Sequence, residues 1–132
     1  MFTGIVQATC EVVAIHKKDG LNTLEVAFKP DLHEGLAIGA SVANNGVCLT
    51  VTQVVDDRVF FDVVEETLRL TNLANLSVGQ RVNIERSLTF GSEIGGHILS
   101  GHIHTKAKVS HISHTEQHYD LTLSVEPKWM NY

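Results

Sequence analysis

The segment Thr3-Gly4-Ile5-Val6 is the first of four residue groups whose types and spacing could support binding or catalysis. A glycine early in a strand permits close approach of a ligand, so the backbone of Gly4, Ile5 and Val6 is a candidate binding surface. A β-bulge at the rim of a barrel explains the same glycine equally well. The sequence leaves both explanations open.

The second group combines Ser41 with Cys48 and its neighbours Leu49 and Thr50. On a strand, Cys48 and Thr50 share one face, whereas Leu49 and Val51 share the other and are expected in the core. A cysteine thiolate can act as a nucleophile where a nearby cation favours the ionised form. A small buried hydrophobic side chain is the commoner role of a single cysteine, and the residues alone favour it.

The third group lies where an expected strand leads into an expected helix. It consists of Asp62, Val63, Val64, Glu65, Glu66 and Thr67. Backbone N–H groups at a helix start can bind the polar edge of a heterocycle or an anion. Ordinary capping of the helix explains the same residues and is favoured without further information.

The fourth group begins with Gly95-Gly96-His97 and continues from Ser100 to His104, with Gly101, His102 and Ile103 at its centre. The paired glycines indicate a conformationally demanding junction. His102 and His104 share one strand face, which raises the possibility of a metal site. Zinc requires a third ligand at a defined spacing, and nothing in the sequence places Cys48 or His97 beside these histidines, so no metal is expected.

Composition limits the classes of function. The chain has 132 residues, 43% of them hydrophobic and 19% charged, with a net charge of -5. This is enough for one domain with residues to spare, and the acidic balance argues against a nucleic-acid partner. The first residues lack the pattern of a signal peptide, and no apolar run is long enough to span a membrane. Two cysteines, Cys10 and Cys48, are expected as free thiols in a cytoplasmic protein.

Apolar residues alternate with a period of two over much of the chain, which predicts an all-β protein. Strands are expected at 2–15, 22–28, from 40 onward, 47–54, 58–64 and 81–86, with a short helix at 65–70. Asn45-Gly46 fits a tight hairpin turn. Six short strands in about ninety residues predict a closed antiparallel barrel or a sandwich, and closure removes open sheet edges.

The pattern then restarts. At an offset of 97, MFTGIVQATCEVVAI aligns with ILSGHIHTKAKVSHI, and five of the 35 overlapping positions are identical. Internal duplication is favoured over two hairpins that share a hydrophobic pattern. We therefore expect one complete barrel at 1–97 and the truncated start of a second copy at 98–132. The second copy contains only its first two strands, and such a hairpin is not stable alone.

These groups, in this order, resemble the riboflavin synthase family across the whole chain. The resemblance rests on MFTGIVQ, GASVANNGVCLTV, FDVVEETLRLTNL, VNIERS and EIGGHILSGHI. It implies two homologous six-stranded Greek-key barrels, each of which binds one lumazine. It also implies a transferase of riboflavin biosynthesis that converts two 6,7-dimethyl-8-ribityllumazine molecules into riboflavin and a pyrimidinedione, without a cofactor or metal.

The resemblance also assigns residues. It implies catalytic roles for Ser41, Cys48 and His102, with His102 as a candidate for proton transfer because imidazole titrates near neutral pH. It places the following residues around the substrate: Gly4, Ile5, Val6, Ser41, Cys48, Leu49, Thr50, Asp62, Val63, Val64, Glu65, Glu66, Thr67, Gly101, His102 and Ile103.

In this family the site is completed between the first barrel of one subunit and the second barrel of a neighbour, and full-length members form trimers. We therefore expect this chain to bind lumazine or riboflavin with little or no turnover alone. We also expect it to form a dimer or to exchange the segment 100–125 between chains. One alternative is a non-catalytic lumazine or flavin carrier or antenna protein of the same fold, and another is a structural β-barrel module that binds no ligand. Ser41, Cys48 and His102 favour the enzyme.

Overall fold

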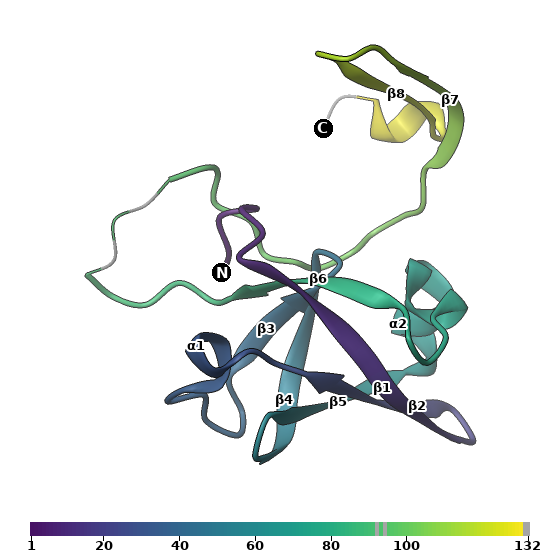
Figure 1. Cartoon of the computed structure of the whole chain (residues 1–132). Coiled ribbons are helices and arrows are strands. Elements are labelled where there is room, and N and C mark those ends of the chain that lie inside the picture. The colour runs from purple at the N-terminus through teal and green to yellow at the C-terminus, as the bar shows by residue number, and fades with distance from the viewer. Residues whose placement is uncertain (92, 94, 131–132) are drawn as a thin grey trace.

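A computed structural model describes residues 1–91, 93 and 95–130 and shows one closed antiparallel barrel joined to a separate hairpin (Figure 1). Around the barrel the strands follow the order β1-β2-β5-β4-β3-β6, and β6 pairs with β1 to complete the closure. Three consecutive strands, β3 to β5, lie beside β2, which is a Greek-key arrangement. The predicted six-stranded barrel is therefore confirmed.

The elements have the following bounds. The barrel strands are β1 (Ala8–Lys18), β2 (Leu21–Ala27), β3 (Ser41–Asn44), β4 (Val47–Val55), β5 (Arg58–Val64) and β6 (Arg81–Arg86). The short helices are α1 (Pro30–His33), α2 (Glu65–Leu70), η1 (Asn72–Asn75) and η2 (Pro127–Trp129), and the hairpin is β7 (Lys108–His114) with β8 (Tyr119–Ser124). Among the described residues, no helix is both long and apolar enough to cross a membrane.

The local predictions differ most at the N-terminus. The strand expected from residue 2 begins only at Ala8, because Gly4 has a φ of 81° and turns the chain out of the extended conformation. Phe2 instead forms an isolated bridge with Leu99. The tight turn at Asn45-Gly46 is confirmed, with φ angles of 50° and 80°.

Alternate residues of the barrel strands fill the interior. Val12, Leu24 and Val26 on β1 and β2 are fully buried, as are Val59 and Phe61 on β5. The hydrophobic pattern therefore fixes which face of each strand points inward, and hence which residues remain on the outer face.

The hairpin β7–β8 repeats the pairing of β1–β2. Val12 pairs with Val26 in the barrel, and the residues 97 positions later, Val109 and Leu123, pair in the hairpin. A register shift follows Val12 in β1 and follows Val109 in β7. All described residues of both hairpin strands are exposed.

The segment 97–107, called the linker below, joins the two parts and runs across the barrel (Figure 1). Phe2 and Leu99 each donate a backbone N–H to the carbonyl oxygen of the other, at 2.8 and 2.9 Å. The His97 N–H donates to the Thr3 carbonyl at 2.9 Å. The linker is thus bonded to the N-terminal segment before it reaches the hairpin.

Candidate functional site

The barrel wall opens between β4 and β5. These strands pair from Val55 and Arg58 up to Val51 and Phe61, and no pairing is described beyond that point. In the same region β4 remains paired with β3 as far as Val47, and β5 remains paired with β2 as far as Val64. The outer neighbours therefore hold the two strands while a gap opens between them.

The linker lies against one side of this opening. The Cys48 N–H donates to the Gly101 carbonyl at 2.9 Å. Gly101 has a φ of 76°, and a Cβ atom there would lie 2.9 Å from the Cys48 Cβ and 3.1 Å from a ring carbon of Phe2. Both the backbone conformation and the lack of space require glycine at this position.

The helix α2 lies on the other side, and a cavity of about 220 Å³ separates it from the linker. The cavity is lined by Val47, Cys48, Glu66, Thr67, Leu70, Thr71, Gly101, His102 and Ile103. Ligand pockets usually have volumes of roughly 300–1,000 Å³, and this cavity lies somewhat below that range, so it leaves no room for two heterocycles. Two larger cavities, beside the N-terminal segment and beside the hairpin, are lined by few of the predicted site residues. An adjoining cavity of about 250 Å³ is lined by Gly4, Gly101, His102 and Ile103.

Backbone polar groups face the opening. The N–H of Val51 donates to the Ala40 carbonyl, and the Val51 carbonyl accepts from the Gly39 N–H, so both groups point away from β5. Successive residues of a strand direct their backbone groups to opposite sides, so those of Thr50 and Cys48 point toward β5.

Glu66 and Arg69 form an ion pair at the rim of the cavity. The Arg69 Nε and Nη2 donate to the two Glu66 carboxylate oxygens at 2.8 and 2.6 Å. These hydrogen bonds lower the pKa of Glu66 and raise the pKa of Arg69. Glu66 therefore stays ionised to a lower pH than an isolated carboxyl group, and Arg69 balances its charge beside the cavity.

The two cysteines differ in access. Cys48 is half-buried and lines the cavity, whereas Cys10 is only 2% exposed and belongs to the core. Burial raises the pKa of the Cys10 thiol, since the charged thiolate is poorly solvated there. Of the two thiols, only Cys48 can meet a ligand in this cavity.

The structure brings six of the residues named from the sequence into the cavity lining. They are Cys48, Glu66, Thr67, Gly101, His102 and Ile103. Three chain segments that are far apart in sequence therefore converge on one place: the start of β4, the helix α2 and the linker.

The remaining residues named near the opening have other environments. Leu49 and Val63 point into the core, at 5% and 1% exposure, so only their backbones could meet a ligand. Thr50, Asp62, Val64 and Glu65 are exposed, and Asp62 accepts a hydrogen bond from the Thr23 hydroxyl at 2.6 Å. Ser41 is half-buried on β3, where it pairs with Thr50, and its carbonyl accepts from the Ser87 N–H.

Gly4, Ile5 and Val6 do not line this cavity. Gly4 lies against the linker, where an added Cβ would meet the Leu99 side chain at 2.9 Å. At the offset of 97, Gly4, Ile5 and Val6 correspond to Gly101, His102 and Ile103. The second copy of this motif therefore occupies the pocket of the first barrel.

Three further residues, Val47, Leu70 and Thr71, line the cavity without having been predicted from the sequence. Helical spacing could have identified two of them, because Leu70 and Thr71 follow Thr67 by three and four residues and so share its face. The Thr71 hydroxyl donates to the Thr67 carbonyl at 2.7 Å. In the part of the chain that the structure describes, no cluster of three or more His, Cys, Asp or Glu side chains could hold a metal ion.

Comparison with known proteins identifies the family. Residues 3–87 match the model of the lumazine binding domain. The riboflavin synthase of Escherichia coli is 48% identical over 126 residues, which cover 96% of this chain and 59% of that protein. The chain belongs to the riboflavin synthase family. The riboflavin synthase of Bacillus amyloliquefaciens is 40% identical over 128 residues and is likewise matched over 59% of its length.

Solved structures support the same family. LumP complexed with riboflavin matches with a TM-score of 0.87 and 30% identity, over 99% of this chain and 71% of LumP. LumP complexed with 6,7-dimethyl-8-(1'-D-ribityl) lumazine matches with a TM-score of 0.85 and 31% identity, over 96% of this chain and 70% of LumP. The riboflavin synthase family thus shares its barrel with a protein that binds lumazine and flavin.

Proposed function

We propose that the cavity between Cys48, α2 and the linker binds one molecule of 6,7-dimethyl-8-ribityllumazine or riboflavin. The observation that carries this proposal is the opening of the β4–β5 seam, at which three distant segments converge on a space for one heterocycle. Ile103, which lines the cavity and packs against the core, supplies apolar contact. LumP, which resembles this chain, forms complexes with both ligands.

The proposed reaction is that of riboflavin synthase, in which one lumazine transfers a four-carbon unit to another. Two substrates must be held face to face, and such positioning accounts for a large part of the rate of a two-substrate reaction. We assign residues 1–97 to one lumazine-binding unit and 98–132 to the start of a second. The repeated register of β1–β2 and β7–β8 supports this division. The 132-residue chain alone is therefore expected to bind ligand with little or no turnover.

The proposed catalytic roles of His102 and Cys48 follow from their positions in the cavity lining. His102 is exposed and lines the cavity, so its imidazole can exchange protons with an acidified methyl group of a bound lumazine. The Cys48 thiol lies in the same lining. Ser41 lies one strand away, opposite Thr50, and its proposed role rests on the family resemblance.

Ligand binding is tested by fluorescence titration with 6,7-dimethyl-8-ribityllumazine. We expect saturation at one molecule per chain and at least about tenfold weaker binding by Gly101→Ala, because the added Cβ pushes the linker off Cys48. Gly35→Ala is the matched control, since Gly35 has a φ of 66° but no atom within 4 Å of an added Cβ. Absence of binding by the unmodified chain at high micromolar ligand would overturn the proposal.

Turnover is tested by steady-state riboflavin formation at saturating lumazine. A rate equal to that of a full-length riboflavin synthase would overturn the expectation that the chain alone is deficient. The second candidate function, a non-catalytic carrier, is favoured by the similarity to the LumP complexes. A carrier forms no riboflavin at any chain concentration. Any riboflavin formation above background that His102→Ala lowers would favour the enzyme over the carrier.

A further inference from the structure

The Glu85 carboxylate is buried at the end of β6, although it belongs to a residue type that is rarely inside a protein. Glu85 is 7% exposed. Among the ion pairs of the described residues, none involves Glu85. The adjacent Arg86 turns its guanidinium toward the carbonyls of Leu32 and Glu34 instead. A buried charge without a counter-ion requires several hydrogen-bond donors.

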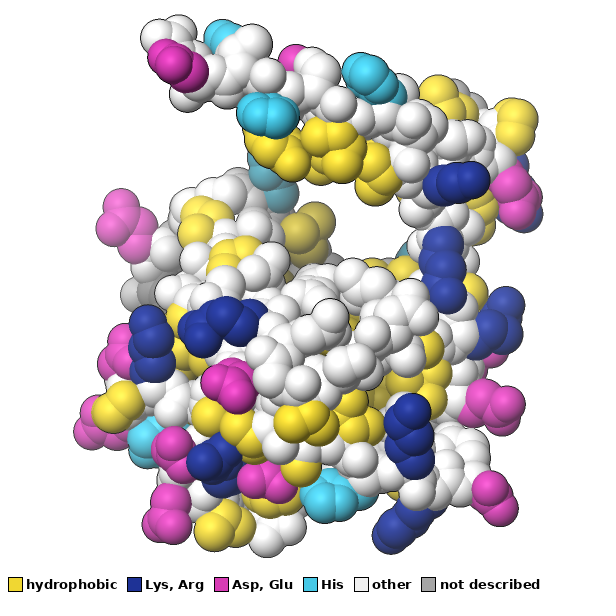
Figure 2. All heavy atoms as spheres, turned by 45° about the vertical axis from the view of Figure 1, so that its right-hand side comes forward, with side chains coloured by type: hydrophobic (Ala, Val, Ile, Leu, Met, Phe, Trp, Pro, Cys, Tyr) yellow, Lys and Arg dark blue, Asp and Glu magenta, His cyan; other side chains and the backbone are white. Residues whose placement is uncertain are grey.

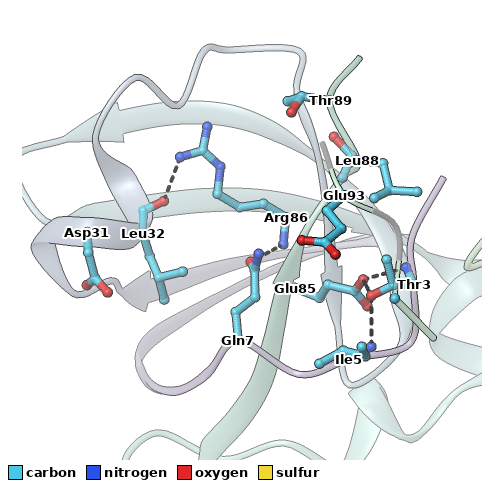
Figure 3. A pocket seen from close by; sticks show the side chains of 12 residues that line it. Thr3, Ile5, Gln7, Asp31, Leu32, Glu85, Arg86, Leu88, Thr89 and Glu93 are labelled. Atoms are coloured by element: carbon cyan, nitrogen blue, oxygen red, sulfur yellow. Dashed lines mark hydrogen bonds between the residues drawn. The ribbon is translucent and has the colours of Figure 1, made fainter. Parts of the chain in front are cut away.

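Those donors come from the N-terminal segment. The Glu85 Oε1 accepts from the Thr3 N–H at 2.6 Å and from the Thr3 hydroxyl at 2.7 Å, and Oε2 accepts from the Gly4 N–H at 3.1 Å. Figure 3 shows the Glu85 carboxylate directed at Thr3. The Thr3 hydroxyl also accepts from the Ile5 N–H at 3.1 Å. Hydrogen bonds to a carboxylate are stronger than those between neutral groups, so one side chain fixes two successive residues.

The fixed segment in turn holds the linker. Thr3 accepts the His97 N–H, and the neighbouring Phe2 exchanges two backbone hydrogen bonds with Leu99. Phe2 is 1% exposed, and one of its ring carbons would lie 3.1 Å from a Cβ at Gly101. The linker therefore rests on Phe2 and Thr3 immediately before Gly101 bonds to the Cys48 N–H.

We propose that Glu85 is a positioning residue for the ligand site. Its carboxylate holds Thr3 and Gly4, the N-terminal segment holds Leu99, and this contact sets Gly101 to Ile103 against Cys48. Glu85 does not line the cavity between Cys48 and α2. It lines an adjoining cavity of about 250 Å³ that shares Gly101, His102 and Ile103 with the first. This inference rests on the proposed function, because it concerns the same pocket.

The test compares lumazine binding by the unmodified chain and by Glu85→Gln, which keeps the size of the side chain but removes its charge. We expect about tenfold weaker binding, since the loss of charge-assisted hydrogen bonds loosens one wall of the pocket. Glu11→Gln is the matched control. It makes the same change at an exposed site on β1 and should bind like the unmodified chain.

Amide hydrogen exchange separates positioning from general destabilisation. In Glu85→Gln we expect faster exchange at Leu99 and Cys48, whose N–H groups hold the linker, and unchanged exchange at Val12 and Phe28 in the barrel. Thr3→Val removes the hydroxyl donor to Glu85 without changing a strand residue. It should also speed exchange at Leu99 and Cys48, by a smaller factor. Thr3→Ser keeps the hydroxyl and should exchange like the unmodified chain. Combining Glu85→Gln with Thr3→Val should add little to the single effects, because both act through one contact.

The outcomes are distinguishable. If the unmodified chain fails to bind lumazine, the proposed function fails. If the unmodified chain binds and Glu85→Gln binds equally well, the positioning role is overturned. Weaker binding with unchanged exchange at Leu99 and Cys48 also overturns it, because the effect would not pass through the linker. Should Glu85→Gln fail to fold, Thr3→Val decides the question by the same two measurements.

Discussion

The two hairpins β1–β2 and β7–β8 have the same backbone pairing and different surroundings. The pairs Val12–Val26 and Val109–Leu123 occupy equivalent positions, and the same register shift follows each. In the barrel, β6 pairs with β1 and β5 pairs with β2. Among the described residues, β7 and β8 pair only with each other. The comparison shows that the sequence of a hairpin specifies its register, whereas neighbouring strands decide its burial.

The exposed fraction of equivalent side chains differs greatly between the two hairpins. Leu24 and Val26 are fully buried, whereas Leu121 and Leu123 are each 55% exposed. Figure 2 shows apolar side chains gathered on the face of the hairpin that looks toward the barrel. Full burial of one such side chain contributes about 1.5–3 kcal/mol, so β7–β8 lacks most of the stabilisation that β1–β2 gains.

The largest expected effect comes from truncating equivalent leucines. Leu24→Ala should lower the free energy of unfolding by about 3 kcal/mol, because it leaves a cavity in the core. Leu121→Ala should change it by less than about 0.5 kcal/mol, since its side chain is half in solvent. Urea unfolding monitored by circular dichroism measures both values. Equal losses at the two positions would mean that the hairpin is buried in solution.

Self-association would provide such burial, and we propose that a second copy of the chain covers the apolar face of the hairpin. Leu121→Ser combined with Leu123→Ser should then weaken dimerisation by roughly thirtyfold, because two apolar contacts are lost in each chain. Ile38→Ser is the control, since Ile38 is 69% exposed and lies outside the hairpin. Light scattering coupled to size-exclusion chromatography measures the change. A monomer at every concentration of the unmodified chain would contradict this expectation.

Thiol reactivity compares burial at Cys10 with burial at the equivalent position of the second copy. Cys10 corresponds to Ala107, which is exposed at the end of the linker. In a Cys48→Ser background, Ala107→Cys should react with a thiol reagent at least about tenfold faster than Cys10. Burial raises the pKa of Cys10, so less of its thiol is ionised at neutral pH.

Absorbance at saturating reagent measures both rates, and the rate at Cys10 should increase only at a higher pH than that of the introduced thiol. In the chain with its natural cysteines, bound lumazine should protect Cys48 and leave Cys10 unchanged. Fast reaction of Cys10 at neutral pH would show that the barrel opens readily.

The smallest effect is expected at the ion pair of α2, an element without a counterpart in the hairpin. Both Glu66 and Arg69 are exposed, so Arg69→Gln should leave the free energy of unfolding almost unchanged. Because Arg69 lowers the pKa of Glu66, any stabilisation is present above the ordinary pKa of a carboxyl group. It is lost as the pH falls through the lowered value. An NMR titration should show the Glu66 pKa rising in Arg69→Gln, and an unchanged pKa would contradict the ion pair.

The sequence by itself determined the local features of this protein. The strands at 58–64 and 81–86 have the bounds that periodicity predicts, and the helix expected at 65–70 is confirmed. The alternation of Leu49 and Val51 with Cys48 and Thr50 separates core from outer face, because side chains of a strand point alternately to its two sides. The duplication at an offset of 97 is also detectable in the sequence, and the pairing of β7 with β8 has the same register as that of β1 with β2.

Only the tertiary structure decided how the site is assembled. Periodicity does not indicate that β4 and β5 are unpaired before Val51 and after Phe61, nor that Gly101, rather than its equivalent Gly4, reaches the Cys48 N–H. It also gives no sign that Glu85, on the outer face of an ordinary strand, is buried by the N-terminal segment. Each feature depends on contacts between residues far apart in the chain, and local hydrophobic patterns carry no information about which distant segments meet.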